Sequence, residues 1–346
     1  SAYGVSGPLH MWIAAFLRDR EQYVRIENCL SPTVCVRSGV PQGSVLGPIL
    51  FILYINDVTD ILVDDVSCKL YADDLKLYCP IVPTLGFSES LQTSLDNLCD
   101  WSLKWQLPIN VDKSFFVTIS RNNICNCVHS YRILCSLLTR RFSVDDLGIA
   151  YDCNLCFDNY VNNIASSAKA KVGLLFRSFK TRDPALLKRA YVTYIRPKLE
   201  YASNLWNPFH KTTIAVLENV QRYFTRRIPS LSIFSYEERL AMLNLDTLEK
   251  RRLKSDLVLY YKILHGLSSI PASAFDTYNT CSVSRSKSSL LRKNIAGTQA
   301  CYFSFSNRAV DCGNVLPSSL TDASSLSVFR SRLDMTDLSH YCTVLA

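Results

Sequence analysis

Two adjacent carboxylates, Asp73 and Asp74, stand in the middle of the apolar segment KLYADDLKLY at residues 69–78. Strands are depleted in Asp, and neighbouring carboxylates repel each other. Divalent cations would offset this repulsion, because they are hard ions that prefer oxygen ligands and keep open positions for phosphate. Two such ions about 3.5–4 Å apart can stabilise the attacking and leaving oxygens of a phosphoryl transfer. The pair therefore indicates either metal-assisted phosphoryl transfer or an exposed acidic turn, in which Asp is also favoured.

The segments around the pair predict elements that could hold it in place. The pair itself lies at a tight turn between two strands, the second covering residues 75–78. Upstream, SGVPQGSVLGP at residues 38–48 predicts a loop that exposes its backbone, and the apolar run after it predicts a buried helix. The other elements expected in this half are a helix over 9–18, a hairpin of 22–26 with 33–37, an amphipathic helix over 88–106, and strands near 115–119 and 131–138.

From about residue 158 the apolar positions recur at helical spacing. One helix is expected to begin at Asp183-Pro184 and to end or kink near Pro197. Another is expected after Thr212 and Thr213, which are good capping residues. Two more are expected between Tyr236 and His265, and the Ser-rich stretch CSVSRSKSS at 281–289 predicts a linker.

Charge and cysteine content narrow the class of protein. The net charge is +8, and residues 151–260 hold 18 basic and 10 acidic side chains, which favours a polyanion-binding surface there. Fourteen cysteines scattered over 346 residues, with no signal peptide pattern, indicate reduced thiols. A zinc site at Cys125, Cys127, His129 and Cys135 is the weaker alternative, because the spacing matches no regular ligand pattern. The sequence contains no apolar stretch of about 18 residues, so it predicts no membrane span.

Two motifs together resemble reverse transcriptases. Ser38-Gly39-Val40-Pro41-Gln42-Gly43-Ser44, with Pro48 and Phe51, is similar to the family's loop and helix behind the templating base and incoming nucleotide. Tyr71-Ala72-Asp73-Asp74 is similar to its metal-binding hairpin, and the order of the two is the same. The wider pattern resembles non-LTR (LINE-type, jockey-like) retrotransposon enzymes, with DREQYV at residues 19–24 and PKLEYA at residues 197–202 among the matching segments.

The resemblance implies an α+β fold. We expect a partial polymerase palm over residues 1–150, built on a split βαβ-like antiparallel sheet with helices. An all-helical, thumb-like nucleic-acid-binding region would cover 151–267, and a small C-terminal region would cover 268–346 after the Ser-rich linker. The implied activity is RNA-directed DNA polymerisation with two Mg²⁺ or Mn²⁺ ions, an RNA template, a DNA primer and dNTPs. The implied localisation is intracellular and nuclear, with no membrane and no obligate protein partner.

The resemblance also assigns roles to residues. Asp73 and Asp74 would be the metal ligands, and Lys113 would protonate the pyrophosphate leaving group, unless it is an ordinary surface lysine. Nucleotide or template would contact Gly39, Pro41, Gln42, Gly43 and Tyr71. The nucleic-acid backbone would contact Lys169, Lys171, Arg177, Lys180, Arg222, Arg226 and Arg227. Trp101, Trp105 and Trp206 could stack on bases, although at helical spacing in apolar surroundings they fit a core better.

Two departures from the family pattern qualify the activity. Relatives carry a third metal-binding Asp on a strand upstream of DREQYV, so we expect a C-terminal fragment that lacks the fingers and the first catalytic-Asp motif and is inactive alone. Relatives also have Trp before Asn in the segment where Gly313 precedes Asn314. Losing that aromatic predicts a cavity or a flexible turn. The alternative function is a non-catalytic nucleic-acid-binding remnant or pseudogene product.

Overall fold

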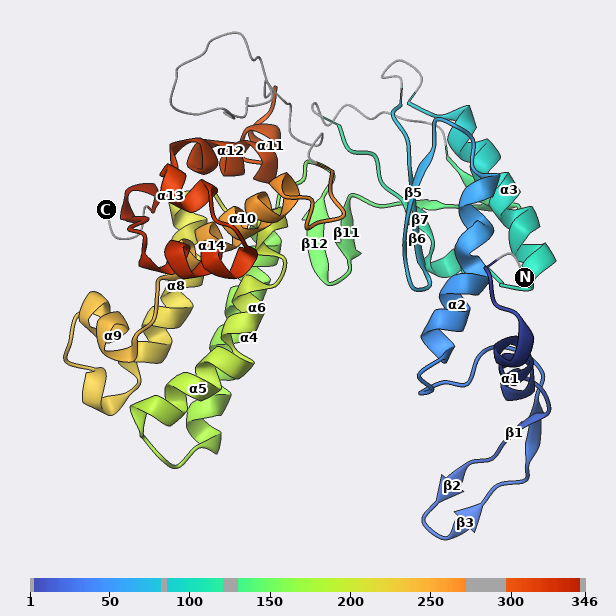
Figure 1. The fold of residues 1–346 in the computed structure, drawn as a ribbon, viewed down its shortest axis with the longest axis horizontal. Helices are drawn as coiled ribbons and strands as arrows, with labels where there is room; N and C mark the ends of the chain where they lie inside the picture. The colour runs from blue at the N-terminus through green and yellow to red at the C-terminus, as the bar shows by residue number, and fades with distance from the viewer. Residues whose placement is uncertain (1–2, 82–85, 121–129, 272–296, 343–346) are drawn as a thin grey trace. The chain divides into compact units, whose positions relative to one another are not determined.

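The computed structural model describes residues 3–81, 86–120, 130–271 and 297–342, which divide into two compact units (Figure 1). Unit 1 comprises Ser1–Phe116 and Cys125–Arg140, and unit 2 comprises Val117–Ile124 and Arg141–Ala346. The expected boundaries at residues 150 and 267 stay a prediction. None of the described helices is long and apolar enough to cross a membrane. The Ser-rich stretch at 281–289 lies outside the described residues.

Unit 1 mixes helices with short strands. Its helices are α1 (Gly7–Leu17), α2 (Gly47–Ile55) and α3 (Glu89–Trp105), with 3₁₀ turns η1 (Asn56–Ile61) and η2 (Val111–Lys113). Its strands are β1 (Arg20–Gln22), β2 (Arg25–Ile26), β3 (Cys29–Leu30), β4 (Val34–Val36), β5 (Ser67–Tyr71), β6 (Asp74–Tyr78), β7 (Phe115–Phe116), β8 (Arg132–Ile133), β9 (Ser136–Leu137) and β10 (Thr139–Arg140).

The strands of the described residues pair two by two. Four antiparallel pairs lie in unit 1, namely β1 with β4, β2 with β3, β5 with β6, and β8 with β9, while β7 pairs parallel to β10. A sixth pair, β11 (Ser143–Asp146) with β12 (Ile149–Asp152), is antiparallel and belongs to unit 2. The α+β class is confirmed, but the described strands form these separate two-stranded ladders in place of the expected split βαβ-like antiparallel sheet. Most of the described strands have only two to four residues.

Helix α3 organises the core of unit 1. Ser88 caps it, since its hydroxyl accepts a hydrogen bond from the Leu91 N–H at 3.2 Å. One side of α3 presents Leu95 and Cys99 to a cluster with Tyr131, Ile133 and Leu138. The next side presents Leu98 and Trp101 to a second cluster, which we call the Trp101 cluster. Its buried members are Ile55, Val58, Leu98 and Trp101, and packed against them are Phe51, Ile61, Leu75, Leu77, Trp105, Leu107 and Ile109.

The apolar run after the Gly/Pro-rich loop does form a helix, α2, but the expectation that it is buried was wrong. Only Gly47 and Ile55 of this helix are buried, and Ile49 and Ile52 are 54% and 55% exposed. A helix that is apolar all round needs partners on every side. The Trp101 cluster covers the side of α2 that carries Phe51 and Ile55. Among the described residues, nothing covers the side that carries Ile49 and Ile52.

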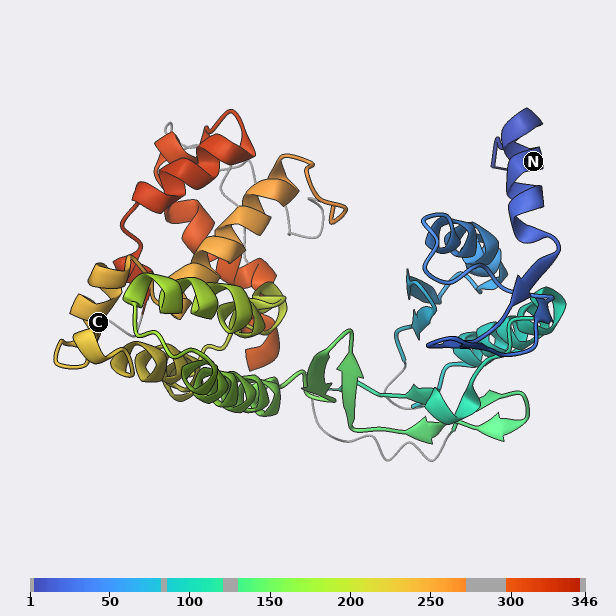
Figure 2. The ribbon, with the colours of Figure 1, turned by 90° about the horizontal axis from the view of Figure 1, so that it is seen from below.

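The secondary structure of the described residues of unit 2 is helical apart from the β11–β12 hairpin. Its helices are α4 (Asp158–Ser178), α5 (Pro184–Tyr194), α6 (Arg196–Glu200), α7 (Ser203–Trp206), α8 (Lys211–Arg226), α9 (Tyr236–Leu243), α10 (Leu248–Leu264), α11 (Gln299–Tyr302), α12 (Phe305–Val315), α13 (Ser318–Thr321) and α14 (Leu326–Met335), with 3₁₀ turns η3 (Pro229–Leu231) and η5 (Ser339–Tyr341). Figure 2 shows the C-terminal helices, in red, beside α10, in orange.

Helices α4 and α8 pack along each other and form the centre of the larger core. Val172 of α4 and Leu217 and Phe224 of α8 are completely buried there. Trp206 is also part of this core, only 1% exposed, and its indole N–H donates to the Tyr201 carbonyl at 2.8 Å. Trp101 is buried in unit 1 in the same way. These two rings are therefore core residues, whereas Trp105 is half-buried against Tyr54, with ring centroids 5.0 Å apart.

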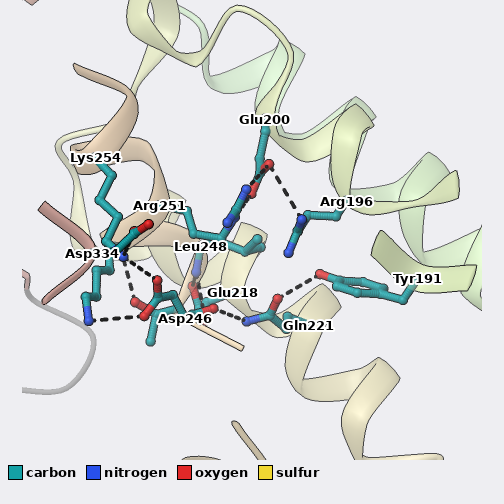
Figure 3. A network of polar contacts seen from close by, with 12 residues as sticks. Tyr191, Arg196, Glu200, Glu218, Gln221, Asp246, Leu248, Arg251, Lys254 and Asp334 are labelled. Atoms are coloured by element: carbon teal, nitrogen blue, oxygen red, sulfur yellow. Dashed lines mark hydrogen bonds and ion pairs between the residues drawn. The ribbon is translucent and has the colours of Figure 1, made fainter. Parts of the chain in front are cut away.

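A buried carboxylate fixes the start of α10 against α8 (Figure 3). Glu218 of α8 accepts hydrogen bonds from the Tyr236 hydroxyl and from the Leu248 N–H, the latter at 3.0 Å. Burial raises the pKa of Glu218, although these two hydrogen bonds favour its charged form. Gln221 extends the network by accepting from the Tyr191 hydroxyl at 3.0 Å and donating to the Tyr236 hydroxyl at 3.1 Å.

Ion pairs continue this network toward the surface (Figure 3). Arg251 of α10 makes a bidentate contact with Glu200 of α6, and Lys254 bridges Asp246 at 2.7 Å and Asp334 of α14 at 2.8 Å. Removing one partner of a buried, hydrogen-bonded charge is costlier than losing an exposed ion pair. The buried Glu218 network holds α8 against α9 and α10, whereas these ion pairs join α10 to α6 and α14.

The helix boundaries can be compared with two N-terminal caps that the sequence predicts. Asp183 caps α5, with its carboxylate accepting from the Ala185 and Leu186 N–H groups, and the chain breaks between α5 and α6 near Pro197, as predicted. The prediction that Thr212 and Thr213 cap the next helix was wrong, because α8 begins at Lys211. The Thr213 hydroxyl instead donates to Asp158 at 3.1 Å and so ties α8 to the first turn of α4.

Gly313 lies within α12 and leaves neither a cavity nor a flexible turn, which corrects the expectation from the sequence. A Cβ built on Gly313 would lie 2.5 Å from Cζ of Tyr260, whose ring is 4% exposed. Tyr260 of α10 therefore fills the space beside the helix backbone.

This packing predicts the effect of restoring an aromatic residue. Gly313→Trp should lower the free energy of unfolding by about 1–3 kcal/mol, the usual cost of overfilling a packed core. The double variant Gly313→Trp/Tyr260→Ala should recover part of that loss, because the new ring can take the place of the old one. Urea unfolding of the four proteins of this cycle measures the coupling. A single Gly313→Trp variant as stable as the parent would contradict the contact.

Candidate active site and basic groove

Asp73 and Asp74 lie at the tip of the β5–β6 hairpin, as the sequence predicts. Tyr71 pairs with Asp74 at the end of the ladder, so Ala72 and Asp73 form a two-residue turn. Ala72 has a φ of 51°, a left-handed conformation that is unfavourable for a residue with a Cβ. Both carboxylates and the Tyr71 side chain are exposed.

The hairpin is held by the residues that follow the pair. Side chains alternate along β6, so Leu75 and Leu77 point to one face and Lys76 and Tyr78 to the other. Leu75 and Leu77 pack into the Trp101 cluster. The Trp101 indole N–H donates to Asp57 at 3.0 Å, which fixes that ring in turn. The acidic turn therefore stands at the end of a strand anchored in the core.

The predicted nucleotide-binding loop has a defined backbone. Gly39 and Gly43 have φ values of 75° and 79°, which favour glycine over any residue with a side chain. The Ser44 hydroxyl donates to the Pro41 carbonyl at 2.7 Å and accepts from the Gly47 N–H at 3.0 Å. This hydroxyl closes the loop onto the first turn of α2. Gln42 and Gly43 are exposed and Pro41 is half-buried.

Arg20 holds the other end of this loop and was missed at the sequence level. Its guanidinium donates to the Gly39 carbonyl at 2.6 Å and to the Ser38 carbonyl at 3.3 Å, while Nε donates to the Leu17 carbonyl at 3.0 Å. Pairing of β1 with β4 brings Arg20 opposite Val36 and so within reach of the loop. The sequence shows an arginine within DREQYV close to a predicted hairpin. It does not indicate that this arginine contacts Gly39, which is nineteen residues away.

The Trp101 cluster connects the loop to the Asp pair. Phe51 of α2 follows the loop, Leu75 of β6 follows the pair, and both side chains pack in this cluster. The structure thus carries the two motifs on elements that share one small core. Lys113 is exposed in η2, and no described hydrogen bond or ion pair joins its side chain to Asp73 or Asp74.

The donor set suits a hard cation in part. Mg²⁺ keeps several waters and is usually held by one or two carboxylates together with substrate phosphates, which the two exposed Asp oxygen donors could satisfy. Within the described ranges, no group of three His, Cys, Asp or Glu side chains could hold a metal. Cys125, Cys127 and His129 of the alternative zinc site lie outside those ranges, and Cys135 is an exposed free thiol.

The predicted backbone-binding residues of unit 2 do not all lie together. Lys169 and Arg177 of α4 and Arg227 at the end of α8 line one groove of about 560 Å³, together with Tyr223. Lys171, Lys180 and Arg226 are exposed but do not line this groove. Arg222 is half-buried, with its guanidinium 4.5 Å from the centroid of the Tyr236 ring.

The Arg20 contacts predict a local effect. Arg20→Ala should speed amide hydrogen exchange at Ser44 and Gly47 about fivefold, because a hydrogen bond contributes about 1 kcal/mol net. Arg25→Ala is the matched control, since Arg25 donates to the Glu27 carbonyl within the β2–β3 hairpin and has no described hydrogen bond to the loop. Unchanged exchange at both amides in a folded Arg20→Ala protein would show that Arg20 does not hold the loop.

Comparisons with known proteins agree with these motifs. Residues 2–159 match the family described as reverse transcriptase (RNA-dependent DNA polymerase). The RNA-directed DNA polymerase from mobile element jockey of Drosophila funebris is 27% identical over 233 residues, which cover 65% of this chain and 25% of that protein. The jockey polymerase of Drosophila melanogaster is 27% identical over 230 residues, with 64% and 25% coverage.

The probable RNA-directed DNA polymerase from transposon BS of Drosophila melanogaster is 25% identical over 255 residues, with 70% and 28% coverage. The chain thus spans about a quarter of the length of these curated relatives. No solved structure gives a significant match. Residues 2–159 of this chain are thus similar to the reverse transcriptase domain, and the chain has homologues among the RNA-directed DNA polymerases of non-LTR transposons.

Proposed function

We propose that this chain is part of an RNA-directed DNA polymerase of a non-LTR retrotransposon, with Asp73 and Asp74 at its catalytic centre. The observation that carries the proposal is the acidic turn itself. Two exposed carboxylates lie at the tip of a hairpin, and the strand that follows them, β6, packs into the Trp101 cluster. Helix α2, which follows the SGVPQG loop, packs into the same cluster. The match of residues 2–159 to the reverse transcriptase family supports the same assignment.

Each residue then has a role in nucleotidyl transfer. Asp73 and Asp74 would hold Mg²⁺ or Mn²⁺, which when bound would stabilise the charge on the reacting phosphate oxygens. Gly39, Pro41, Gln42 and Gly43 expose backbone without bulky side chains, so that a nucleotide or template base can approach, and Tyr71 stands beside the acidic turn. Lys113 would give a proton to the leaving pyrophosphate if substrate binding brings the two together.

The proposed substrates are an RNA template, a DNA primer with a free 3′-OH and dNTPs. In this proposal unit 1 supplies part of the palm and the helices of unit 2 act as the thumb-like region, with action in the nucleus. The basic side chains of unit 2 also support a second candidate, a non-catalytic nucleic-acid-binding protein, because a groove with three cationic side chains needs no metal site to bind phosphates.

Metal binding at the acidic turn can be measured without turnover. Mn²⁺ titrated in the presence of a dNTP and followed by electron paramagnetic resonance should bind the parent chain, and Asp73→Asn or Asp74→Asn should weaken that binding at least tenfold. The matched control is Asp64→Asn/Asp65→Asn, an exposed adjacent pair just before β5. Equal loss in the control, or no loss in the two single variants, would remove Asp73 and Asp74 from the proposed centre.

Polymerase activity gives a separate prediction. Primer extension on an RNA template with Mg²⁺ should be undetectable for the 346-residue chain, because the described residues offer no third ligand beside the Asp pair. Extension that Asp73→Asn abolishes would contradict this prediction and show that two carboxylates suffice. Extension that persists in Asp73→Asn would contradict the assigned catalytic centre.

A further inference from the structure

The groove on unit 2 combines cations, an aromatic ring and a residue without a side chain. Lys169, Gly173 and Arg177 recur every four residues along one face of α4, and Tyr223 and Arg227 stand four residues apart on α8. Such spacing places them on facing sides of the two packed helices. None of the residues that line the groove is acidic.

Two aromatic rings lie close to the cationic side chains of the groove. Lys169 Nζ lies 5.1 Å from the centroid of the Tyr223 ring, and the Arg227 guanidinium lies 5.3 Å from the same centroid and 4.9 Å from that of Phe176. Arg227 also donates to the Tyr223 hydroxyl at 2.5 Å. Cations held over aromatic faces lose less freedom when they bind an anion. The groove is therefore arranged for an anionic ligand before that ligand arrives.

The size and chemistry of the groove indicate which class of ligand it suits. About 560 Å³ is the volume of a small-molecule site, enough for one nucleotide unit and far too small for a duplex. Tyr223 is half-buried, so part of its ring faces the groove, and a Cβ built on Gly173 would meet nothing within 4 Å, which keeps the floor of the groove open. A positively charged groove with an aromatic platform suits a single strand, because only an unpaired base has a face free to stack.

We propose that the α4–α8 groove binds one nucleotide unit of single-stranded nucleic acid, with phosphates at Lys169, Arg177 and Arg227 and a base against Tyr223. The choice of a nucleic acid as the polyanion rests on the proposed function, and the groove gives it a defined place and strand state. The other predicted cations, Lys171, Lys180, Arg222 and Arg226, lie outside the groove and contribute only diffuse attraction.

Fluorescence anisotropy on the full chain tests this site, with a 12-nucleotide single strand and a hairpin duplex of the same composition as probes. The single strand should bind at least tenfold more tightly than the duplex at 150 mM salt. Arg177→Gln and Lys169→Gln should each lower the slope of log affinity against log salt by about 0.7, the value for one phosphate contact on a single strand. Lys171→Gln and Arg226→Gln, on the same two helices, should change that slope by much less.

Stacking is tested at Tyr223. Tyr223→Leu should weaken binding about tenfold without changing the salt slope, and Tyr223→Phe should retain the affinity, because it keeps the ring. Circular dichroism melting checks that each variant is folded. Equal slopes for groove and control variants, or equal affinity for the duplex and the single strand, would overturn the proposal.

Failure here is distinguishable from failure of the proposed function. Asp64→Asn/Asp65→Asn changes exposed carboxylates of unit 1 outside the proposed catalytic centre, so this variant should bind the single strand with unchanged affinity. Loss of single-strand binding in this variant would contradict a separate site on α4 and α8. Normal Mn²⁺ binding at the Asp pair, together with no single-strand binding at all, would overturn the groove alone.

Discussion

The packing of Leu75 and Leu77 of β6 against Trp101 of α3 is the contact on which the proposed catalytic centre depends. Two neighbouring carboxylates repel each other and would move apart on a mobile turn. A short two-stranded ladder is marginal in water by itself, so its stability must come from the apolar face that it buries. Phe51 of α2 packs in the same Trp101 cluster, which means that one small core supports both the acidic turn and the loop before α2.

The packing of unit 2 holds several cationic side chains close together. Helices α4 and α8 pack through residues that are fully buried, and Glu218 and Gln221 join α8 to Tyr236 of α9. Glu218 also joins α8 to Leu248 at the start of α10 (Figure 3). With its inner face held in this way, α8 can present Tyr223 and Arg227 beside the cations of α4. The Arg227 guanidinium rests on the Phe176 and Tyr223 rings, so packing and charge placement depend on the same aromatic side chains.

Local patterns in the sequence predicted the elements well, and tertiary contacts explain the rest. The β5–β6 hairpin, the Ser88-led helix α3 and the break near Pro197 follow from alternation, capping and proline chemistry. Burial of α2 and capping by Thr213 were wrong, because each depends on what a neighbouring element offers. The Arg20 contact with Gly39 and the groove between Lys169 and Arg227 join residues distant in sequence, and helix periodicity does not set how two helices align.

The central claim is that the acidic turn and the SGVPQG loop belong to one site. Paramagnetic broadening of backbone amide signals by bound Mn²⁺ tests it most directly, because the effect falls steeply with distance from the ion. The account predicts that Mn²⁺ broadens the amides of Gly39 and Gly43 together with those of residues 71–74, and that Asp73→Asn/Asp74→Asn abolishes both effects. Broadening confined to residues 71–74, with the loop signals unchanged, would contradict it.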